Sequence, residues 1–168
     1  AKQARFTSHQ EILSLKGKIP NAIQKSRSQL LENEEIQKII TVISAGIEDS
    51  CKPSRARIGR VMLLMDADPD GSHITSLVLC FFAKYMRPIL DEGMVFVVDS
   101  PLFKAEWKGK DFYGRDRDEV VKQLPKSATP LITRFKGHGE APWQDLRYYA
   151  MADSRKLLKV SCTDDTES

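Results

Sequence analysis

Three aspartates spaced two residues apart follow a short apolar run near the middle of this chain. The string reads Asp66-Ala67-Asp68-Pro69-Asp70-Gly71. In an extended chain, side chains two residues apart point to the same face, so Asp66 and Asp68 can present their carboxylates together. Two such hard oxygen ligands suit Mg²⁺, which takes one or two carboxylates and keeps positions for water and phosphate. The string therefore predicts a metal site for phosphate chemistry, with Asp70 as a third candidate ligand.

Two other interpretations of the aspartates compete with a magnesium site. A calcium loop of the EF-hand type also uses alternating acids, but it needs a glutamate at its twelfth position, where this chain has Leu77. It also needs a helix before the loop, whereas an apolar, strand-like run precedes Asp66. A solvated turn that caps the next helix is the second alternative, and the pattern alone leaves it open.

The segments around the aspartates predict a strand–helix–strand unit that would position them. Residues 61–65 are wholly apolar, which is typical of a strand covered on both faces. Apolar residues then recur at helical spacing from Ser72, and Pro88 predicts a kink or an end. A second apolar strand at 94–98 gives a parallel sheet with a right-handed crossover. Asp66 would lie at a strand's carboxyl end, where such sheets bind ligands and helix N-termini favour phosphate.

The rest of the chain predicts helices, one further strand and polar stretches. Asn33 is a predicted N-cap, followed by apolar residues on one face of a helix as far as Ile43. Further predicted elements are the start of a helix at 1–14, a short helix near 119–124 within a polar stretch, a strand at 131–135, a helix at 143–151 and a disordered acidic tail at 161–168.

Composition sets the broad class of protein. With 168 residues, 41% hydrophobic and 29% charged, the chain suits one ordinary globular domain. A net charge of +3 permits a nucleic-acid partner without demanding one. No apolar run is long enough to span a bilayer, and no signal peptide is expected. The cysteines form neither a disulfide framework nor a zinc motif, so a reducing cytoplasm is expected; they are Cys51, Cys80 and Cys162.

Other residues could meet phosphate, each with a plainer alternative. A turn around Gly17 carries Lys18 and Asn21, which could contact a phosphate backbone or simply be solvated. His73, one turn into the predicted helix, could contact phosphate or cap local structure. His138 has no partner that the sequence can supply. The pair Tyr148-Tyr149 is more typical of a packed core than of a nucleophile. Without a P-loop or a Gly-x-Ser-x-Gly elbow, a P-loop ATPase and an acyl-transfer hydrolase lack support.

Five segments, in order, resemble one known family. They stand at 15–21, 33–36, 65–74, 86–88 and 134–140 and read LKGKIPN, NEEI, MDADPDGSHI, MRP and RFKGHGE. Together they resemble the TOPRIM region of type IIA DNA topoisomerases, most nearly the B subunits of DNA gyrase and of topoisomerase IV. The resemblance spans about residues 1–160. The aspartate string alone is moderately specific, whereas the five segments in order are highly specific.

The resemblance implies a fold and a set of site residues. The fold class would be α/β, a Rossmann-like TOPRIM fold with a parallel sheet flanked by helices and a small C-terminal α/β extension. Asp66 would be a catalytic acid, and the implied metal ligands are Asp66, Asp68 and, as a further candidate, Asp70. The residues implied to approach DNA are Lys18, Asn21, His73 and Arg155. The implied divisions are a TOPRIM domain at 1–103 without its first strand, a short polar insertion at 104–130, the C-terminal part of the B-subunit core at 131–160 and the tail at 161–168.

The chain also departs from the family pattern. The family's first catalytic acid is a glutamate in a Glu-Gly-Asp-Ser-Ala motif on the first strand. That motif is expected immediately before Ala1, and its glutamate would be the general acid/base and a metal ligand. The nucleophilic tyrosine belongs to the family's A subunit, so no tyrosine here is expected to take that role. Pro20 and His138 replace usual leucines and are interpreted as tolerated variation.

The resulting prediction is the Mg²⁺-dependent, DNA-binding TOPRIM part of an ATP-dependent type IIA topoisomerase, which assists cleavage and religation by the A-subunit tyrosine. Mn²⁺ or Ca²⁺ could substitute for Mg²⁺, and ATP would act only through an ATPase domain outside the chain. The implied partners are double-stranded DNA, the A subunit and the ATPase portion of the B subunit, with no membrane. The expected location is the cytoplasm, at the nucleoid.

Alternatives to this prediction stay open. The chain alone is expected to be inactive, because the first catalytic glutamate lies outside it. A catalytically silent DNA-binding or assembly module is therefore one alternative. An independent TOPRIM nuclease or primase-like protein is another, but the matching segments at 15–21 and 134–140 lie outside the common TOPRIM core and argue against it.

Overall fold

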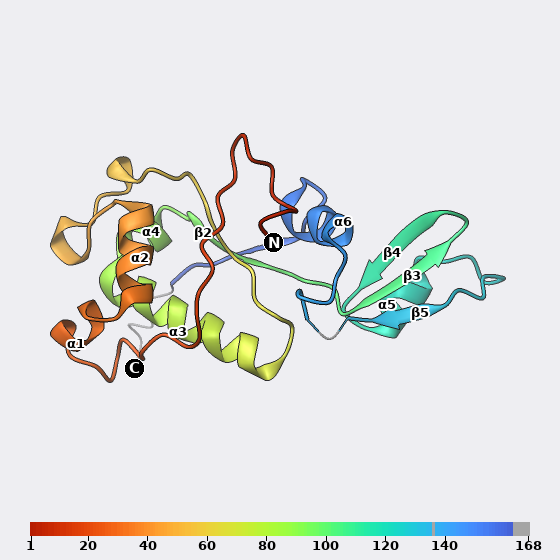
Figure 1. The fold of residues 1–168 in the computed structure, drawn as a ribbon, viewed down its shortest axis with the longest axis horizontal. Helices are drawn as coiled ribbons and strands as arrows, with labels where there is room; N and C mark the ends of the chain where they lie inside the picture. Colours follow the sequence, from red (N-terminus) through yellow and green to blue (C-terminus); the bar gives the residue numbers. More distant parts are fainter. Residues whose placement is uncertain (136, 163–168) are drawn as a thin grey trace.

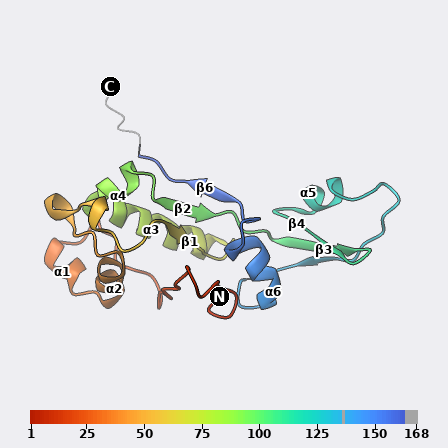
Figure 2. The ribbon, with the colours of Figure 1, turned by 90° about the horizontal axis from the view of Figure 1, so that it is seen from above.

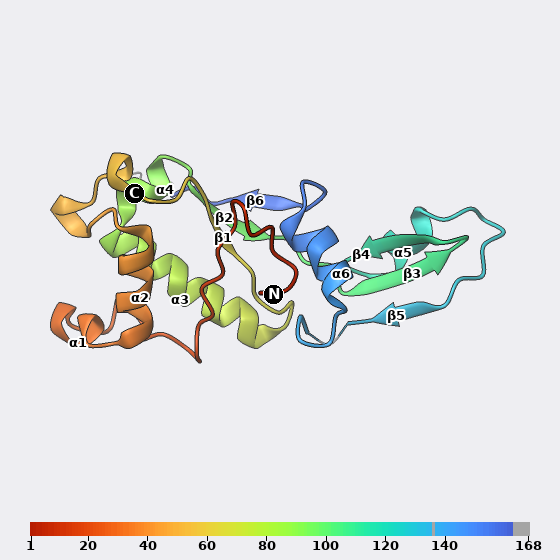
Figure 3. The same cartoon turned by 45° about the horizontal axis from the view of Figure 1, so that its top comes forward.

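The computed structural model describes residues 1–135 and 137–162, which form two three-stranded sheets with helices around them (Figure 1). The elements are α1 (Arg27–Leu31), α2 (Glu34–Ile43), η1 (Glu48–Ser50), η2 (Pro53–Arg55), β1 (Val61–Leu63), α3 (Pro69–Tyr85), α4 (Arg87–Asp91), β2 (Val95–Val98), β3 (Phe103–Trp107), β4 (Lys110–Gly114), α5 (Arg117–Lys122), β5 (Ile132–Arg134), α6 (Trp143–Leu146), η3 (Arg147–Met151) and β6 (Leu157–Lys159). Helices α1 to α4 gather at one end of the molecule, the sheet β4-β3-β5 projects at the other, and α6 lies between them (Figures 1 and 3). The predicted α/β fold class is confirmed.

The first sheet contains the predicted strand–helix–strand unit. β1 pairs in parallel with β2, with Leu63 opposite Val97, and α3 connects the two strands. β6 runs beside β2 in the antiparallel direction, so the sheet is mixed rather than wholly parallel (Figure 2). Both faces of β1 are covered, since Leu63 packs into one apolar cluster and its neighbours Met62 and Leu64 into another.

The helix after β1 begins within the aspartate string. The Asp68 carboxylate accepts a 2.6 Å hydrogen bond from the N–H of Gly71 and caps α3. Pro69 takes the first helical position, where a missing N–H costs nothing. The helix therefore starts three residues before Ser72, the predicted start. Its buried face carries Leu77, Val78, Phe81, Phe82 and Tyr85.

Near the N-terminus, one predicted helix is confirmed and one is wrong. The Asn33 side chain accepts hydrogen bonds from two backbone N–H groups at 3.1 Å and caps α2, as predicted. Residues 1–14 form turns and extended chain instead of a helix start. The side chain of Arg147 explains this difference, because its Nε donates to the carbonyl of Ala4 at 2.9 Å and its guanidinium lies 4.9 Å over the ring of Phe6. These distant contacts outweigh the local helical pattern.

The polar stretch at 104–130 holds more structure than the sequence predicts. β3 and β4 form an antiparallel hairpin around Lys108 and Gly109, which both have positive φ angles. The predicted short helix is α5, and the predicted strand at 131–135 is β5, which pairs with the other edge of β3. The ends of this region meet, since the N–H of Phe135 donates to the carbonyl of Leu102 at 2.8 Å. We call residues 103–134 the hairpin module.

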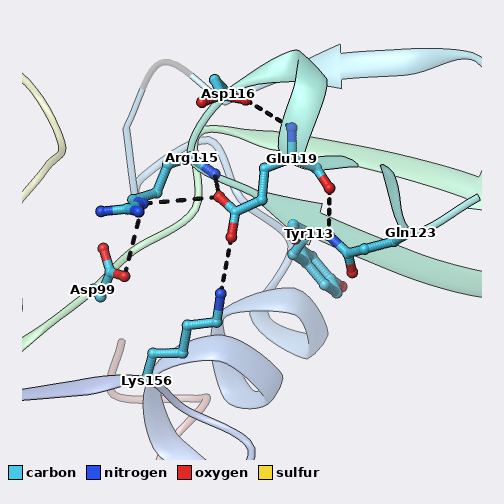
Figure 4. Close-up of polar contacts among 7 residues, drawn as sticks. All are labelled: Asp99, Tyr113, Arg115, Asp116, Glu119, Gln123 and Lys156. Carbon is cyan, nitrogen blue, oxygen red and sulfur yellow. Dashed lines mark hydrogen bonds and ion pairs between the residues drawn. The ribbon is translucent and has the colours of Figure 1, made fainter. Parts of the chain in front are cut away.

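Polar contacts hold the hairpin module against the first sheet. On one side, Lys156, directly before β6, donates to the Glu119 carboxylate of α5 at 3.0 Å (Figure 4). On another, Lys104 of β3 lies 2.8 Å from the buried carboxylate of Asp145 in α6. Arg115 lies beside both Glu119 and Asp99, at 3.8 and 4.0 Å (Figure 4). The module is therefore tied to the core through charged side chains.

The last predicted elements are partly confirmed. The helix expected at 143–151 is present as α6 followed by η3, a π-helical turn. The strand β6 was not predicted, because its residues Leu157–Lys159 are preceded by charged residues and show no apolar run. Residues 163–168 of the expected disordered tail lie outside the described residues. None of the described helices is long and apolar enough to cross a membrane. The division into domains stays a prediction.

Candidate functional site

The three aspartates lie at the carboxyl end of β1, and all are exposed. Oδ1 of Asp66 accepts a 2.7 Å hydrogen bond from the backbone N–H of His138. Oδ1 of Asp68 accepts the capping bond from Gly71. Each of these two carboxylates thus uses one oxygen on a backbone N–H. Among the described residues, no hydrogen bond reaches the second oxygen of either group.

The backbone between β1 and α3 depends on a glycine. A Cβ on Gly71 would lie 2.0 Å from the carbonyl oxygen of Asp66 and 2.9 Å from its carbonyl carbon. Backbone atoms cannot yield as a flexible side chain can, so only glycine allows the first turn of α3 to pack this closely. This contact places Asp66 beside the helix N-terminus.

Asp70 points to a lysine rather than to its fellow aspartates. Its Oδ1 lies 2.8 Å from the Nζ of Lys18, and both side chains are exposed. The hydrogen bond and the charge of Lys18 lower the pKa of Asp70 below its usual value. A predicted metal ligand and a predicted DNA contact therefore neutralise each other in this structure.

The other residues predicted to approach DNA differ in their placement. His73 is exposed on the first turns of α3, near enough to Asp70 for its charge to act on that group. The Asn21 side chain accepts a 2.9 Å hydrogen bond from the N–H of Ile23 and shapes its own turn. Lys18, Asp70 and His73 are thus brought together, and their contacts with DNA stay predictions.

Arg155 lies apart from this group and is turned inward. Its side chain is 11% exposed, and its Nη1 donates to the carbonyls of Met151 and Ala152 at 3.1 and 2.7 Å. Its Nε is buried without a hydrogen bond from any described residue. A DNA contact from Arg155 stays a prediction and would require the guanidinium to turn outward.

The carboxylates fit a cation that brings its own further ligands. Within residues 1–135 and 137–162, no three His, Cys, Asp or Glu side chains are placed together to hold a metal ion. Asp66 and Asp68 offer one uncommitted oxygen each. Mg²⁺ accepts one or two carboxylates and completes its shell with waters or phosphate oxygens, so the two aspartates fit it without a closed protein cage.

One residue of this site, His138, was not predicted from the sequence. It was interpreted as tolerated variation without a partner, but its Nε2 lies 2.8 Å from the carbonyl of Met65 and its Nδ1 lies 3.0 Å from the hydroxyl of Tyr149. Burial, followed by the charges of Asp145 and Asp66, raises the pKa of Tyr149 to about 12. Nothing in the sequence signals the contact with Met65, because it joins residues 73 apart in the chain, and the contact with Tyr149 depends on the π-helical turn η3.

A cavity of about 960 Å³ opens beside β1. It is lined largely by residues 7–15 and 57–65, with Val78 and Phe82 of α3 and Arg155. β1 has β2 on one edge only, and within the described part of the chain no strand pairs with its other edge. The site therefore adjoins an open sheet edge that ends at the aspartates.

Comparisons with known proteins identify the family of this chain. The Toprim domain family matches residues 1–99. The chain is 42% identical over 169 residues to the DNA gyrase B subunit of Halalkalibacterium halodurans, covering 98% of this chain and 26% of that protein. It is 36% identical to the DNA gyrase B subunit of Archaeoglobus fulgidus and also 36% identical to that of Thermotoga maritima, covering 98% and 100% of this chain. The chain spans about a quarter of the length of these relatives, at 26%, 26% and 27%.

Proposed function

Since this chain belongs to the Toprim domain family, we propose that it forms the Toprim part of the B subunit of a type IIA DNA topoisomerase. In this role Asp66 and Asp68 bind a divalent cation and assist DNA cleavage and religation. The observation that carries the proposal is the pair of exposed carboxylates at the carboxyl end of β1, each with one uncommitted oxygen. The likeness to gyrase B subunits over 98% of the chain supports the same role.

The proposal assigns the nucleophile to another polypeptide. Tyr113 and Tyr149 are hydrogen-bonded to Asp145 and to His138, and burial raises the pKa of both hydroxyls. Such protonated, shielded hydroxyls are poorly suited to attack a phosphate. The attacking tyrosine would come from an A subunit. ATP would act through an ATPase portion outside residues 1–168, and the substrate would be double-stranded DNA at the nucleoid.

The cation would be Mg²⁺, with Mn²⁺ or Ca²⁺ as substitutes. When bound, it would stabilise the negative charge that develops at the scissile phosphate. Asp66 and Asp68 would hold it, and Lys18 and His73 would contact the phosphate backbone. Contacts with phosphates carry little sequence preference and weaken as salt rises, so DNA binding should be strongly salt-dependent.

A third acidic ligand would come from a segment other than the one that carries Asp66 and Asp68. We propose that a strand bearing a glutamate pairs in parallel with the open edge of β1. The free edge and the adjacent cavity of about 960 Å³ support this arrangement. Because carboxyl ends of parallel strands meet at one edge of a sheet, the added strand would end beside Asp66. The glutamate would act as general acid/base and third ligand.

The test is Mg²⁺-dependent DNA cleavage by an assembly that contains this chain, the third acid and an A subunit. Asp66→Asn should lower cleavage by about 100-fold or more, because several kcal/mol of charge stabilisation would be lost. Asp118→Asn, an exposed acid in the first turn of α5, is the matched control and should cleave normally. Normal cleavage by Asp66→Asn would overturn the proposal.

A catalytically silent DNA-binding or assembly module is the second candidate. The observation that favours it is that Asp70 is paired with Lys18, while no three-ligand cluster forms among the described residues. The same assembly separates the two candidates. A silent module would bind DNA in a salt-dependent manner, yet Asp66→Asn would leave cleavage unchanged.

A further inference from the structure

His138 contacts Asp66 and its neighbour through both its backbone and its ring. Its backbone N–H donates to Oδ1 of Asp66 at 2.7 Å. Its ring Nε2 lies 2.8 Å from the carbonyl oxygen of Met65, the residue directly before Asp66. The His138 side chain is 18% exposed, so the ring contact is partly buried, whereas the Asp66 carboxylate is 46% exposed and open to solvent. One residue thus reaches the site acid from two directions.

The Met65 carbonyl and the Tyr149 hydroxyl determine which nitrogen of the His138 ring carries the hydrogen. A carbonyl oxygen only accepts, so the Nε2 that faces Met65 carries the hydrogen. In the neutral ring Nδ1 is then the acceptor, and the hydroxyl of Tyr149 at 3.0 Å is its donor. Tyr149 is 5% exposed and belongs to the π-helical turn η3, whereas its neighbour Tyr148 points outward and is 51% exposed. The turn therefore directs one of two adjacent tyrosines behind His138.

These contacts act on the geometry of Asp66. The carbonyl of Met65 and the nitrogen of Asp66 belong to one planar peptide unit, so a hydrogen bond to the carbonyl orients the backbone of the acid. The ladder with β2 ends at Leu63, and the ring supplies a partner beyond it. Gly137, the residue before His138, also lies close to the Asp66 carboxylate, because a Cβ on Gly137 would lie 3.2 Å from Oδ1 of Asp66.

We propose that His138 is a positioning residue that, with Tyr149 behind it, holds Asp66 in one orientation and leaves Oδ2 for a cation. The assignment of the cation rests on the proposed function. The fixed orientation of Asp66 stands on the hydrogen bonds alone, and the two parts are tested separately.

The orientation is tested by NMR on the metal-free chain, using the couplings between the α and β protons of Asp66. A side chain held in one rotamer gives either one large and one small coupling or two small ones, while an averaging side chain gives two intermediate ones. Wild type should show one rotamer. His138→Leu and Tyr149→Phe should show averaging, and His138→Gln, which keeps a donor, should restore part of the order. Tyr148→Phe is the matched control and should match wild type.

Unchanged couplings in a folded His138→Leu variant would overturn the proposal. If His138→Leu does not fold, as judged by circular dichroism, Tyr149→Phe decides, since it removes a single oxygen atom. Unchanged couplings in Tyr149→Phe would then overturn it.

The cation part is tested with Mn²⁺ alone, by following the electron paramagnetic resonance signal of the free ion. His138→Leu should weaken Mn²⁺ binding about tenfold, as is usual when a residue that orients a metal ligand is lost. If the Asp66 side chain of His138→Leu averages between rotamers while the Mn²⁺ affinity stays unchanged, His138 has no role in cation binding. If Asp66→Asn binds Mn²⁺ as wild type does, the proposed function fails instead, while the couplings still decide whether His138 holds Asp66.

Discussion

Oδ1 of Asp66 lies 2.7 Å from the backbone nitrogen of His138, although 72 residues separate the two in sequence. The contact closes the loop after β5 onto the carboxyl end of β1. The acid proposed to bind a cation is therefore held by a segment that follows the hairpin module, and not only by its own strand and helix.

Gly71→Ala should damage the site through the backbone. The added methyl group would lie 2.0 Å from the carbonyl oxygen of Asp66, so β1 and α3 must separate. We expect a loss of about 1–3 kcal/mol in the free energy of unfolding, measured by urea denaturation. Gly139→Ala is the control, because a Cβ there has no neighbour within 4 Å and the φ angle is not in the left-handed region. Equal losses for both variants would contradict the close packing.

The ion pair between Lys18 and Asp70 should be lost at low pH. The lysine lowers the pKa of Asp70 below the ordinary value of 3.8. The contribution of the pair is therefore fully present above pH 3.8 and is lost as pH falls through the lowered pKa. An NMR titration of the carboxyl group should show the lowered pKa, and Lys18→Met should move it back up. Lys25→Met, at another exposed lysine, should not.

The Tyr149 hydroxyl should lose its proton at a higher pH than an ordinary tyrosine does. Burial raises its pKa from 10.0 to about 12. Because the folded value lies above the unfolded one, the stabilisation is complete below pH 10.0 and is lost as pH rises towards about 12. Ultraviolet titration should show a phenolate step near 12 that Tyr149→Phe removes. The step should persist in Tyr148→Phe, and its persistence in Tyr149→Phe would refute the assignment.

Lys104→Met should destabilise the protein strongly. The lysine lies 2.8 Å from the Asp145 carboxylate, which is 7% exposed, and its removal leaves a buried charge without its cation. Loss of one partner of a buried pair costs about 3–5 kcal/mol, whereas exposed pairs are worth about 0–1 kcal/mol. Lys156→Met is the matched control, since its pair with Glu119 is 66% and 30% exposed (Figure 4). Similar losses in urea denaturation would argue against a buried charge.

The strand–helix–strand unit could be predicted because its signals are local. The apolar run, the capping Asp68 and Pro88 each act on neighbouring residues, and the structure places β1, α3 and β2 accordingly. The position of the aspartates at the carboxyl end of β1 follows from this unit. The position of the aspartates in the fold could therefore be predicted from residues close together in the chain.

The contacts around the aspartates could not be predicted, because they depend on distant segments. The contact of His138 with Met65 spans 73 residues, and that of Arg147 with Ala4 spans 143. The second also explains why no helix starts at the N-terminus. Strands β3, β4 and β6 were missed for a different reason, since each carries charged residues that obscure an apolar or alternating pattern.

The hydrogen bond between the N–H of Phe135 and the carbonyl of Leu102 has a consequence for changes in chain length. The hairpin module departs from the core and returns to it at one point, so residues gained or lost at its far turn leave the span between its ends unchanged. The turn at Lys108 and Gly109, with no atom within 4 Å of a Cβ on that glycine, is thus a natural place to insert a tag or a fluorescent reporter without disturbing Asp66.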